Sequence, residues 1–155
     1  MKKIPLNKKV LEARLSEIRF DLKKLQHFQN FSLDQFLEAE NFAIAEHYLR
    51  RALEAIFDIG NHILSRLSIP PGEKPSTYKE IAQLLGRYKV IPRNFAEDAL
   101  AKMAGYRIRL VHFYHQVTEE ELYQIIQTNL VDVEKFCRFI KQIIDDPQKL
   151  NLKIK

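Results

Sequence analysis

The sequence has little of what several other fold classes require. Its single cysteine, Cys137, cannot form an intrachain disulfide, so nothing indicates an oxidising compartment. Only four of the 155 residues are glycine, which argues against the many tight turns of a small β-barrel. No apolar run approaches the roughly 18 residues that span a membrane, and no apolar segment follows the basic N-terminus as in a signal peptide. These absences predict a soluble, cytoplasmic protein.

The residues that are present suit one compact domain. Hydrophobic residues make up 46% of the chain and aromatic residues 10%, which supplies a core without a disulfide or a metal ion. The length is typical of a single domain. We therefore assign residues 1–155 to one domain, with the core of the bundle at about 8–146.

Positive charge is concentrated in two segments. Residues 1–28 contain eight lysines and arginines and three acidic residues, an excess that equals the net charge of +5. Residues 87–115 contain six basic and two acidic residues, a local excess of +4. Two basic regions on a nearly neutral body can bind a polyanion such as RNA. The alternative is that both are ordinary solvated helix faces.

Apolar residues spaced by three and four predict helices along the whole chain. The first runs from about Lys8 to Phe28. A capping box of Ser32 and Gln35 begins a second, which is about 35 residues long and ends at Leu67. A helix of that length would form the spine of a bundle or of a dimer.

Capping residues and prolines place the remaining elements. Residues 68–75 hold three prolines and a glycine and form a loop. A short helix is expected after it, from Thr77 to about Leu85, with Gly86 at its end. The next helix begins at Ile91-Pro92 and weakens or bends at Gly105. The last helix runs from Thr118 to Ile144. The sum is an all-α, up-and-down bundle of four main helices with additional short helices.

The segment 105–115 contains two arginines, two histidines and two tyrosines. Metal-independent RNA cleavage needs proton acceptors and donors, which histidine supplies, and a cation for the phosphate, which arginine supplies. The alternative is that these side chains only pack. His112 and His115 are three apart, but no nearby carboxylate or cysteine completes a metal site. We expect neither a metal nor a cofactor.

The spacing within this segment sets a geometric problem. On a straight helix, Arg107 and His112 point about 140° apart, whereas Arg107 and Tyr114 differ by about 20°. One straight helix cannot direct all three side chains at one phosphate. Either the backbone bends near Gly105, or a second subunit supplies the missing group.

Arg107, four residues, His112, one residue and Tyr114 form a pattern that resembles the Arg-x4-His-x-Tyr motif of the HEPN superfamily, in particular its HepT toxin branch. Further segments resemble that family and follow in the family's order: residues 52–63, the proline-rich loop, 78–80, Ile91-Pro92 and 103–107. The similarity covers about residues 9–145. The resemblance implies a HEPN-type four-helix bundle.

The resemblance also implies a function. It points to a homodimeric endoribonuclease toxin, paired with a minimal nucleotidyltransferase antitoxin of the MntA type. Arg107 would bind phosphate and His112 would act as general acid or base at a composite site in the dimer cleft. The antitoxin would attach AMP to Tyr114, where the added phosphate and adenosine would repel RNA and fill the cleft. Ile108 departs from the family, which usually has a polar residue there, and this predicts reduced activity if that group helps to hold RNA.

Four more residues are candidates for RNA binding or for orienting the motif: Arg109, His115, Asp58 and Asn61. Arg109 could compensate electrostatically for Ile108. Asp58 and Asn61 are explained equally well as polar positions of an ordinary helix. A competing function is that of a noncatalytic HEPN subunit that binds a nucleotidyltransferase and a nucleotide or RNA. A third possible function is that of a purely structural helical dimer.

Overall fold

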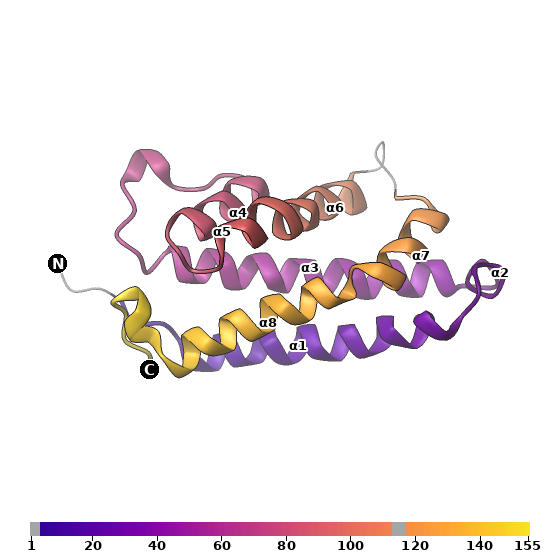
Figure 1. The fold of residues 1–155 in the computed structure, drawn as a ribbon, viewed down its shortest axis with the longest axis horizontal. Helices are drawn as coiled ribbons and strands as arrows, with labels where there is room; N and C mark the ends of the chain where they lie inside the picture. Colours follow the sequence, from indigo (N-terminus) through magenta and orange to yellow (C-terminus); the bar gives the residue numbers. More distant parts are fainter. Residues whose placement is uncertain (1–3, 113–116) are drawn as a thin grey trace.

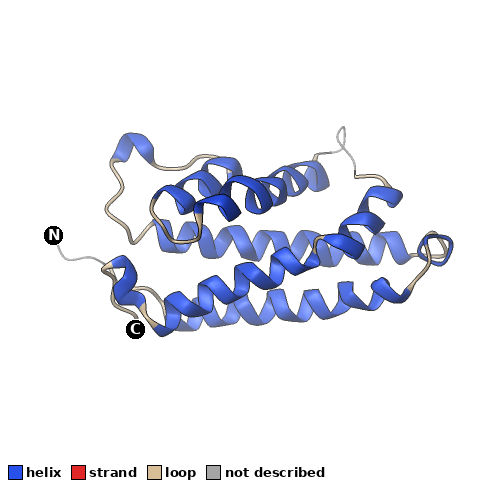
Figure 2. Cartoon of the chain, in the orientation of Figure 1, coloured by secondary structure: helices blue, strands red, loops and turns tan. Residues whose placement is uncertain are grey.

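The computed structural model describes residues 4–112 and 117–155, and this part of the chain is a bundle of helices (Figures 1 and 2). The predicted all-α class is confirmed. The longest elements are α1 (Lys8–His27), α3 (Asn41–Leu64), α6 (Ala101–Val111) and α8 (Leu130–Asp145). The shorter ones are α2 (Leu33–Phe36), α4 (Tyr78–Arg87), α5 (Arg93–Phe95) and α7 (Glu119–Thr128), with a π-helical segment at Ala96–Leu100 that joins α5 to α6.

Helix α3 is the centre of the bundle. It contacts α1 on one side and α4, α6 and α7 on others, an arrangement that Figure 1 shows along the length of the molecule. Its small residues permit this crowding: a Cβ on Gly60 would lie only 2.9 Å from Cδ1 of Leu85 in α4. Buried leucines and isoleucines of α3 occupy the remaining core positions, because spacing by three and four brings them onto inward faces.

The predicted second helix is wrong in one respect, because the structure divides it into α2 and α3. The capping box is confirmed, with Oγ of Ser32 accepting from the Gln35 N–H at 3.1 Å and Oε1 of Gln35 accepting from the Ser32 N–H at 2.9 Å. The helix is interrupted at residues 37–40, where Ala39 has a left-handed φ of 52°. This turn allows fully buried Phe36 to pack against Phe28 and Tyr123. Helix α3 is therefore about 36 Å long rather than about 50 Å.

The end of the short helix and the last helix also differ from expectation. Gly86 lies inside the last turn of α4, where a Cβ would meet Ala96 at 2.7 Å, so this glycine permits close packing and does not end the helix. The predicted helix from Thr118 to Ile144 is divided at Asn129 into α7 and α8. Its start is confirmed, because Oγ1 of Thr118 accepts from the Glu121 N–H at 3.1 Å.

The two ends of the chain lie together. The Leu6 N–H donates to the Lys153 carbonyl and the Lys155 N–H donates to the Leu6 carbonyl, each at 2.9 Å. Figure 1 places these ends at the opposite end of the bundle from the C-terminus of α6. No helix within the described ranges is long and apolar enough to cross a membrane.

Candidate functional site

Arg107 lies near the C-terminus of α6 and reaches into the junction of three helices. Its Nη2 donates to Oε1 of Glu54 in α3 at 2.8 Å, and its guanidinium carbon lies 5.2 Å from the centre of the Tyr78 ring in α4. The side chain is only 11% exposed. A carboxylate and an aromatic face attract the cation independently of each other. Arg107 is therefore a fixed and largely shielded guanidinium.

One donor of this guanidinium is unsatisfied. Nε of Arg107 is buried and has no hydrogen-bond partner among the described residues. A buried donor without a partner costs roughly 1–3 kcal/mol. An acceptor that reached Nε, such as a phosphate oxygen, would recover that free energy.

His112 is the C-cap of α6. Its N–H donates to the Ile108 carbonyl at 3.0 Å, and its backbone is already extended, with φ −87° and ψ 120°. The side chain is exposed and lines a hollow of about 300 Å³. The other described residues that line this hollow are Phe42, Glu46, Arg109, Leu110, Val111 and Val117. The structure thus brings His112 and Arg109 to one hollow, whereas Arg107 is not among its described lining residues.

These positions change the geometric problem posed by the spacing. Helix α6 remains helical through Gly105, so the predicted bend there is wrong. The backbone leaves the helix at His112 instead, and the angle of about 140° between two positions of one helix does not apply to this residue. The spacing alone therefore no longer requires a second subunit.

Arg109 is bound by Glu121 of α7. Its Nη1 and Nη2 donate to the two carboxylate oxygens at 2.7 and 2.6 Å. This bidentate pair raises the pKa of Arg109 and lowers the pKa of Glu121, chiefly through the hydrogen bonds themselves. Glu121, whose N–H donates to Thr118 at the start of α7, thus uses its carboxylate to join α6 to α7. A role of Arg109 in RNA binding stays a prediction.

Two of the predicted site residues, Tyr114 and His115, lie outside the described residues. Ile108, the departure from the family motif, is 37% exposed, and Val111 one turn later is 51% exposed. Residues three apart on a helix share a face. An apolar strip of these two side chains therefore lies beside His112.

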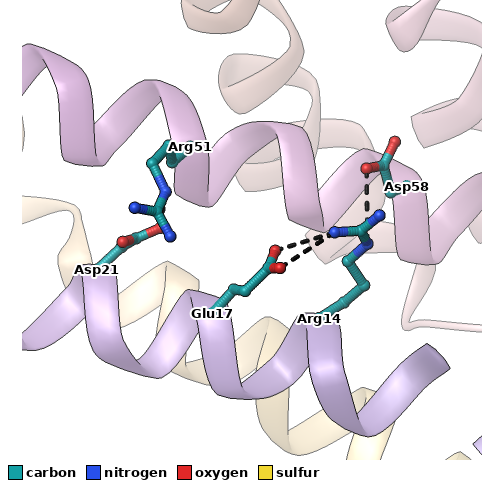
Figure 3. A network of polar contacts seen from close by, with 5 residues as sticks. All are labelled: Arg14, Glu17, Asp21, Arg51 and Asp58. Atoms are coloured by element: carbon teal, nitrogen blue, oxygen red, sulfur yellow. Dashed lines mark hydrogen bonds and ion pairs between the residues drawn. The ribbon is translucent and has the colours of Figure 1, made fainter. Parts of the chain in front are cut away.

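Asp58 faces α1 in the structure. Its Oδ2 lies 3.7 Å from Nε of Arg14, which also donates to both oxygens of Glu17 at 3.1 and 3.2 Å (Figure 3). Asn61 is exposed and lines a different hollow, with Ser65 and Lys74 among its neighbours. The prediction that either residue orients the motif stays a prediction.

The network in Figure 3 also contains a buried carboxylate. Asp21 of α1 is fully buried, and its nearest cation is Arg51 of α3, with Nε 3.6 Å from Oδ2. Neither oxygen has a hydrogen-bond partner within the described part of the chain. Burial raises the pKa of Asp21 to about 6, although Arg51 acts against the shift.

Sequence reasoning did not single out Glu54 and Tyr78, the two residues that hold Arg107. Glu54 is 53 residues away from Arg107, so no local pattern connects them. The only signal was indirect, because both residues lie in segments that resemble the HepT branch. In residues 4–112 and 117–155, no three His, Cys, Asp or Glu side chains are grouped so that they could hold a metal ion.

Comparison with known sequences identifies relatives. The profile of a family described as "Ribonuclease HepT-like" matches residues 18–140. A protein named "tRNA nuclease HepT" from Aphanizomenon flos-aquae is 30% identical over 135 residues, which cover 86% of this chain and 87% of that protein. A protein named "mRNA nuclease HepT" from Shewanella oneidensis is 34% identical over 95 residues, which cover 60% and 67%.

Solved structures agree with the sequence comparison. The tri-AMPylated HEPN toxin of Shewanella oneidensis, determined in complex with an MNT antitoxin, superposes with a TM-score of 0.73 at 26% identity, covering 86% of this chain and 97% of that one. The Bacillus subtilis protein YutE, described as a cytosolic protein of unknown function, superposes with a TM-score of 0.75 at 20% identity, covering 93% and 95%. The second likeness concerns the fold alone. The predicted HEPN-type bundle is confirmed.

Proposed function

The chain belongs to the Ribonuclease HepT-like family, and from this membership we propose that it is an endoribonuclease toxin that cleaves RNA without a metal ion. The observation that carries the proposal is the pair formed by a fixed Arg107 and an exposed His112 at the end of α6. Relatives named as nucleases of tRNA and of mRNA support RNA as the substrate class.

The chemistry follows from these two side chains. In the proposed reaction, the ribose 2′-oxygen attacks the adjacent phosphorus, its proton passes to a base, and the 5′-oxygen leaves with a proton from an acid. His112 serves as one of these proton-transfer groups. Arg107 stabilises the negative charge that grows on the phosphorane, and its unsatisfied Nε offers a donor for it. The products are a 2′,3′-cyclic phosphate and a free 5′-hydroxyl.

We propose that the active form is a homodimer with a composite site. Within one chain, His112 lines a hollow, and Arg107 is not among the described residues that line it. A phosphate that contacts both side chains is therefore reached more readily by Arg107 of one chain and His112 of another. The exposed Ile108 and Val111 supply apolar surface beside His112 for such a contact.

The partner we propose is a minimal nucleotidyltransferase antitoxin that attaches AMP to Tyr114. The similar HEPN toxin that is tri-AMPylated and bound to an MNT antitoxin supports this pairing. Coexpression with a neighbouring nucleotidyltransferase gene should add whole AMP units to the intact mass of the chain. Tyr114→Phe should abolish the addition, and an unchanged addition in that variant would place the modification elsewhere.

Cleavage itself is tested with purified protein and RNA in the presence of a chelator. Wild-type protein should yield cyclic phosphate or 3′-phosphate ends, and His112→Ala should be inactive. His47→Ala, which removes another exposed histidine, is the control and should retain activity. Equal cleavage by His112→Ala and wild type would reject the role of His112.

The second candidate is a noncatalytic HEPN subunit that binds a nucleotidyltransferase and a nucleotide or RNA. The observation that favours it is the pairing of Arg107 with Glu54, which neutralises the guanidinium, together with Ile108 in place of a polar residue. The same assay separates the two, since this candidate predicts no cleavage by the wild-type chain.

A further inference from the structure

A second basic region lies far from His112. A hollow of about 410 Å³ is lined by the end of α4, the start of α5, α8 and the turn at Pro147–Leu150. In Figure 1 the C-terminal part of α8 and the turn after it lie near the two chain ends, whereas the C-terminus of α6 lies toward the other end of the molecule. The helical segment from Arg93 to Val111 spans about 27 Å, which approximates the distance between the two regions.

Four cations line this hollow, namely Arg87, Lys89, Arg93 and Lys149, and none of its described lining residues is acidic. Arg93 is paired with Glu97 at 2.8 Å. For the other three, no ion pair with any described residue is formed. The hollow therefore holds an uncompensated charge of about +3.

Two of these three cations belong to residues 87–115 and supply half of the local excess of that segment. Four of the six cations of that segment have a carboxylate partner: Arg93, Lys102, Arg107 and Arg109. The two that have none among the described residues, Arg87 and Lys89, both line the hollow. Among the described residues of 87–115, the positive charge without an ion pair thus lies at this hollow and not beside Arg107.

The backbone at Lys89 is unusual in a way that agrees with a binding role. Lys89 has a left-handed φ of 60°, a conformation that favours glycine or asparagine. Hydrogen bonds from its own N–H to the Gly86 carbonyl at 3.1 Å and from the Val90 N–H to the Leu85 carbonyl at 2.9 Å hold this turn. A long cation thus lies at a position where glycine would be less strained.

The rest of the hollow is apolar and aromatic. Phe139 of α8 is half-buried and packs edge-on against Phe95, with ring centres 5.1 Å apart. The other apolar residues that line it are Val90, Ile91, Pro92, Ile143 and Leu150. Cations beside an aromatic surface suit a nucleic acid, in which phosphates contact the cations and an unpaired base contacts the apolar residues.

We propose that this hollow, lined by Arg87, Lys89, Arg93, Lys149 and Phe139, is a second RNA-binding site that anchors the substrate about 27 Å from the cleavage site. The proposal rests on RNA being the substrate of the proposed function. A short A-form RNA duplex can span that distance, so one folded RNA reaches both regions.

The test uses the full chain with His112→Ala, so that RNA is bound without being cleaved. The pocket variant adds Arg87→Gln, Lys89→Asn and Lys149→Gln, and asparagine keeps the left-handed turn acceptable. The control variant adds Lys79→Gln, Lys135→Gln and Lys153→Gln, so both variants lose the same charge. These three exposed lysines lie outside both basic segments and likewise have no ion pair with a described residue. Fluorescence anisotropy with a labelled RNA hairpin that has an unpaired overhang gives Kd over a range of salt concentrations.

We expect the pocket variant to raise Kd roughly tenfold and to lower the slope of log affinity against log salt by about 2, with much smaller changes in the control. An equal loss of RNA affinity in both variants would overturn the proposal. So would a pocket variant that binds RNA as tightly as the parent but no longer binds an acidic protein partner. Absence of cleavage by the wild-type chain would reject the proposed function, but the anisotropy data would still decide whether the hollow binds RNA.

Discussion

At the scale of single residues, the ion pair between Arg107 and Glu54 sets up a competition with the phosphate of a substrate. The carboxylate lies 2.8 Å from the guanidinium and neutralises a cation that the proposed reaction needs. It also keeps Arg107 in place together with Tyr78. Glu54 is a positioning residue in this scheme, because it acts through Arg107.

Glu54→Gln separates these two effects. The amide oxygen can still accept from Arg107, but the negative charge is removed. We expect KM for RNA to fall roughly threefold to fivefold, because a half-exposed pair contributes up to about 1 kcal/mol. Glu54→Ala should instead lower kcat, since Arg107 loses its support. Steady-state cleavage assays give both constants. Glu134→Gln, at an exposed position of α8, is the control, and an equal fall of KM in that control would show a nonspecific charge effect.

Asp21 provides a prediction about pH. Its pKa is raised to about 6 in the folded chain, mainly by burial, so the folded state binds more protons than the unfolded state between about pH 4 and pH 6. The free energy of unfolding therefore falls as pH rises through that range, and the loss is complete above it. Asp21→Asn should remove this contribution and raise the stability at pH 7.5 by on the order of 2 kcal/mol.

Urea unfolding at a series of pH values measures this effect. The difference between Asp21→Asn and wild type isolates Asp21 from other titrating groups such as His62, whose pKa is lowered by burial and, to a lesser degree, by Arg66. Arg51 loses its partner in the variant, but at 42% exposure it remains solvated. A difference in stability that does not change with pH would contradict the assignment to Asp21.

At the scale of helices and turns, the residues that cap a helix could be predicted and the interruptions could not. Ser32, Thr77 and Thr118 each accept from the backbone N–H three residues on, as their positions in the sequence indicated. The turn at 37–40 and the division at Asn129 contain neither glycine nor proline, and apolar spacing continues across both. Packing of distant residues, such as Phe36 against Tyr123, decides these interruptions.

In the candidate site, too, local features could be predicted from the sequence and long-range contacts could not. The motif containing Arg107 and His112 is local and could be read from the sequence. The carboxylates that bind Arg107 and Arg109 could not be predicted in this way. Glu54 and Glu121 lie in other helices, 53 and 12 residues away from the arginines they bind. Nor could spacing show that α6 ends at Val111, which changes the direction of His112.

The turn between α2 and α3 can be tested through Ala39. An alanine at φ 52° is strained, and glycine is not, so Ala39→Gly should raise the free energy of unfolding by about 0.5–1 kcal/mol. Ala13→Gly, at an exposed position inside α1, should lower it by about 1 kcal/mol. Chemical denaturation measures both, and a loss of stability in Ala39→Gly would show that residue 39 is helical in solution.

At the scale of the whole molecule, the proposed composite site gives a prediction that no single chain can satisfy. If Arg107 of one chain acts with His112 of the other, Arg107→Ala and His112→Ala are each inactive alone. Mixed after unfolding and refolding together, half of the dimers pair one variant with the other, and each such dimer holds one intact site and one doubly altered site. Activity should therefore return to about one quarter of the wild-type value.

Native mass spectrometry of tagged chains measures the heterodimer fraction against which this activity is judged. Heterodimers that form in the expected proportion but remain inactive would show that both residues must come from one chain or that every site needs all four side chains. A monomeric mass for wild type at assay concentrations would remove the composite site altogether. Activity that appears only as heterodimers form would tie cleavage to the contact between two chains, because neither parent supplies both groups.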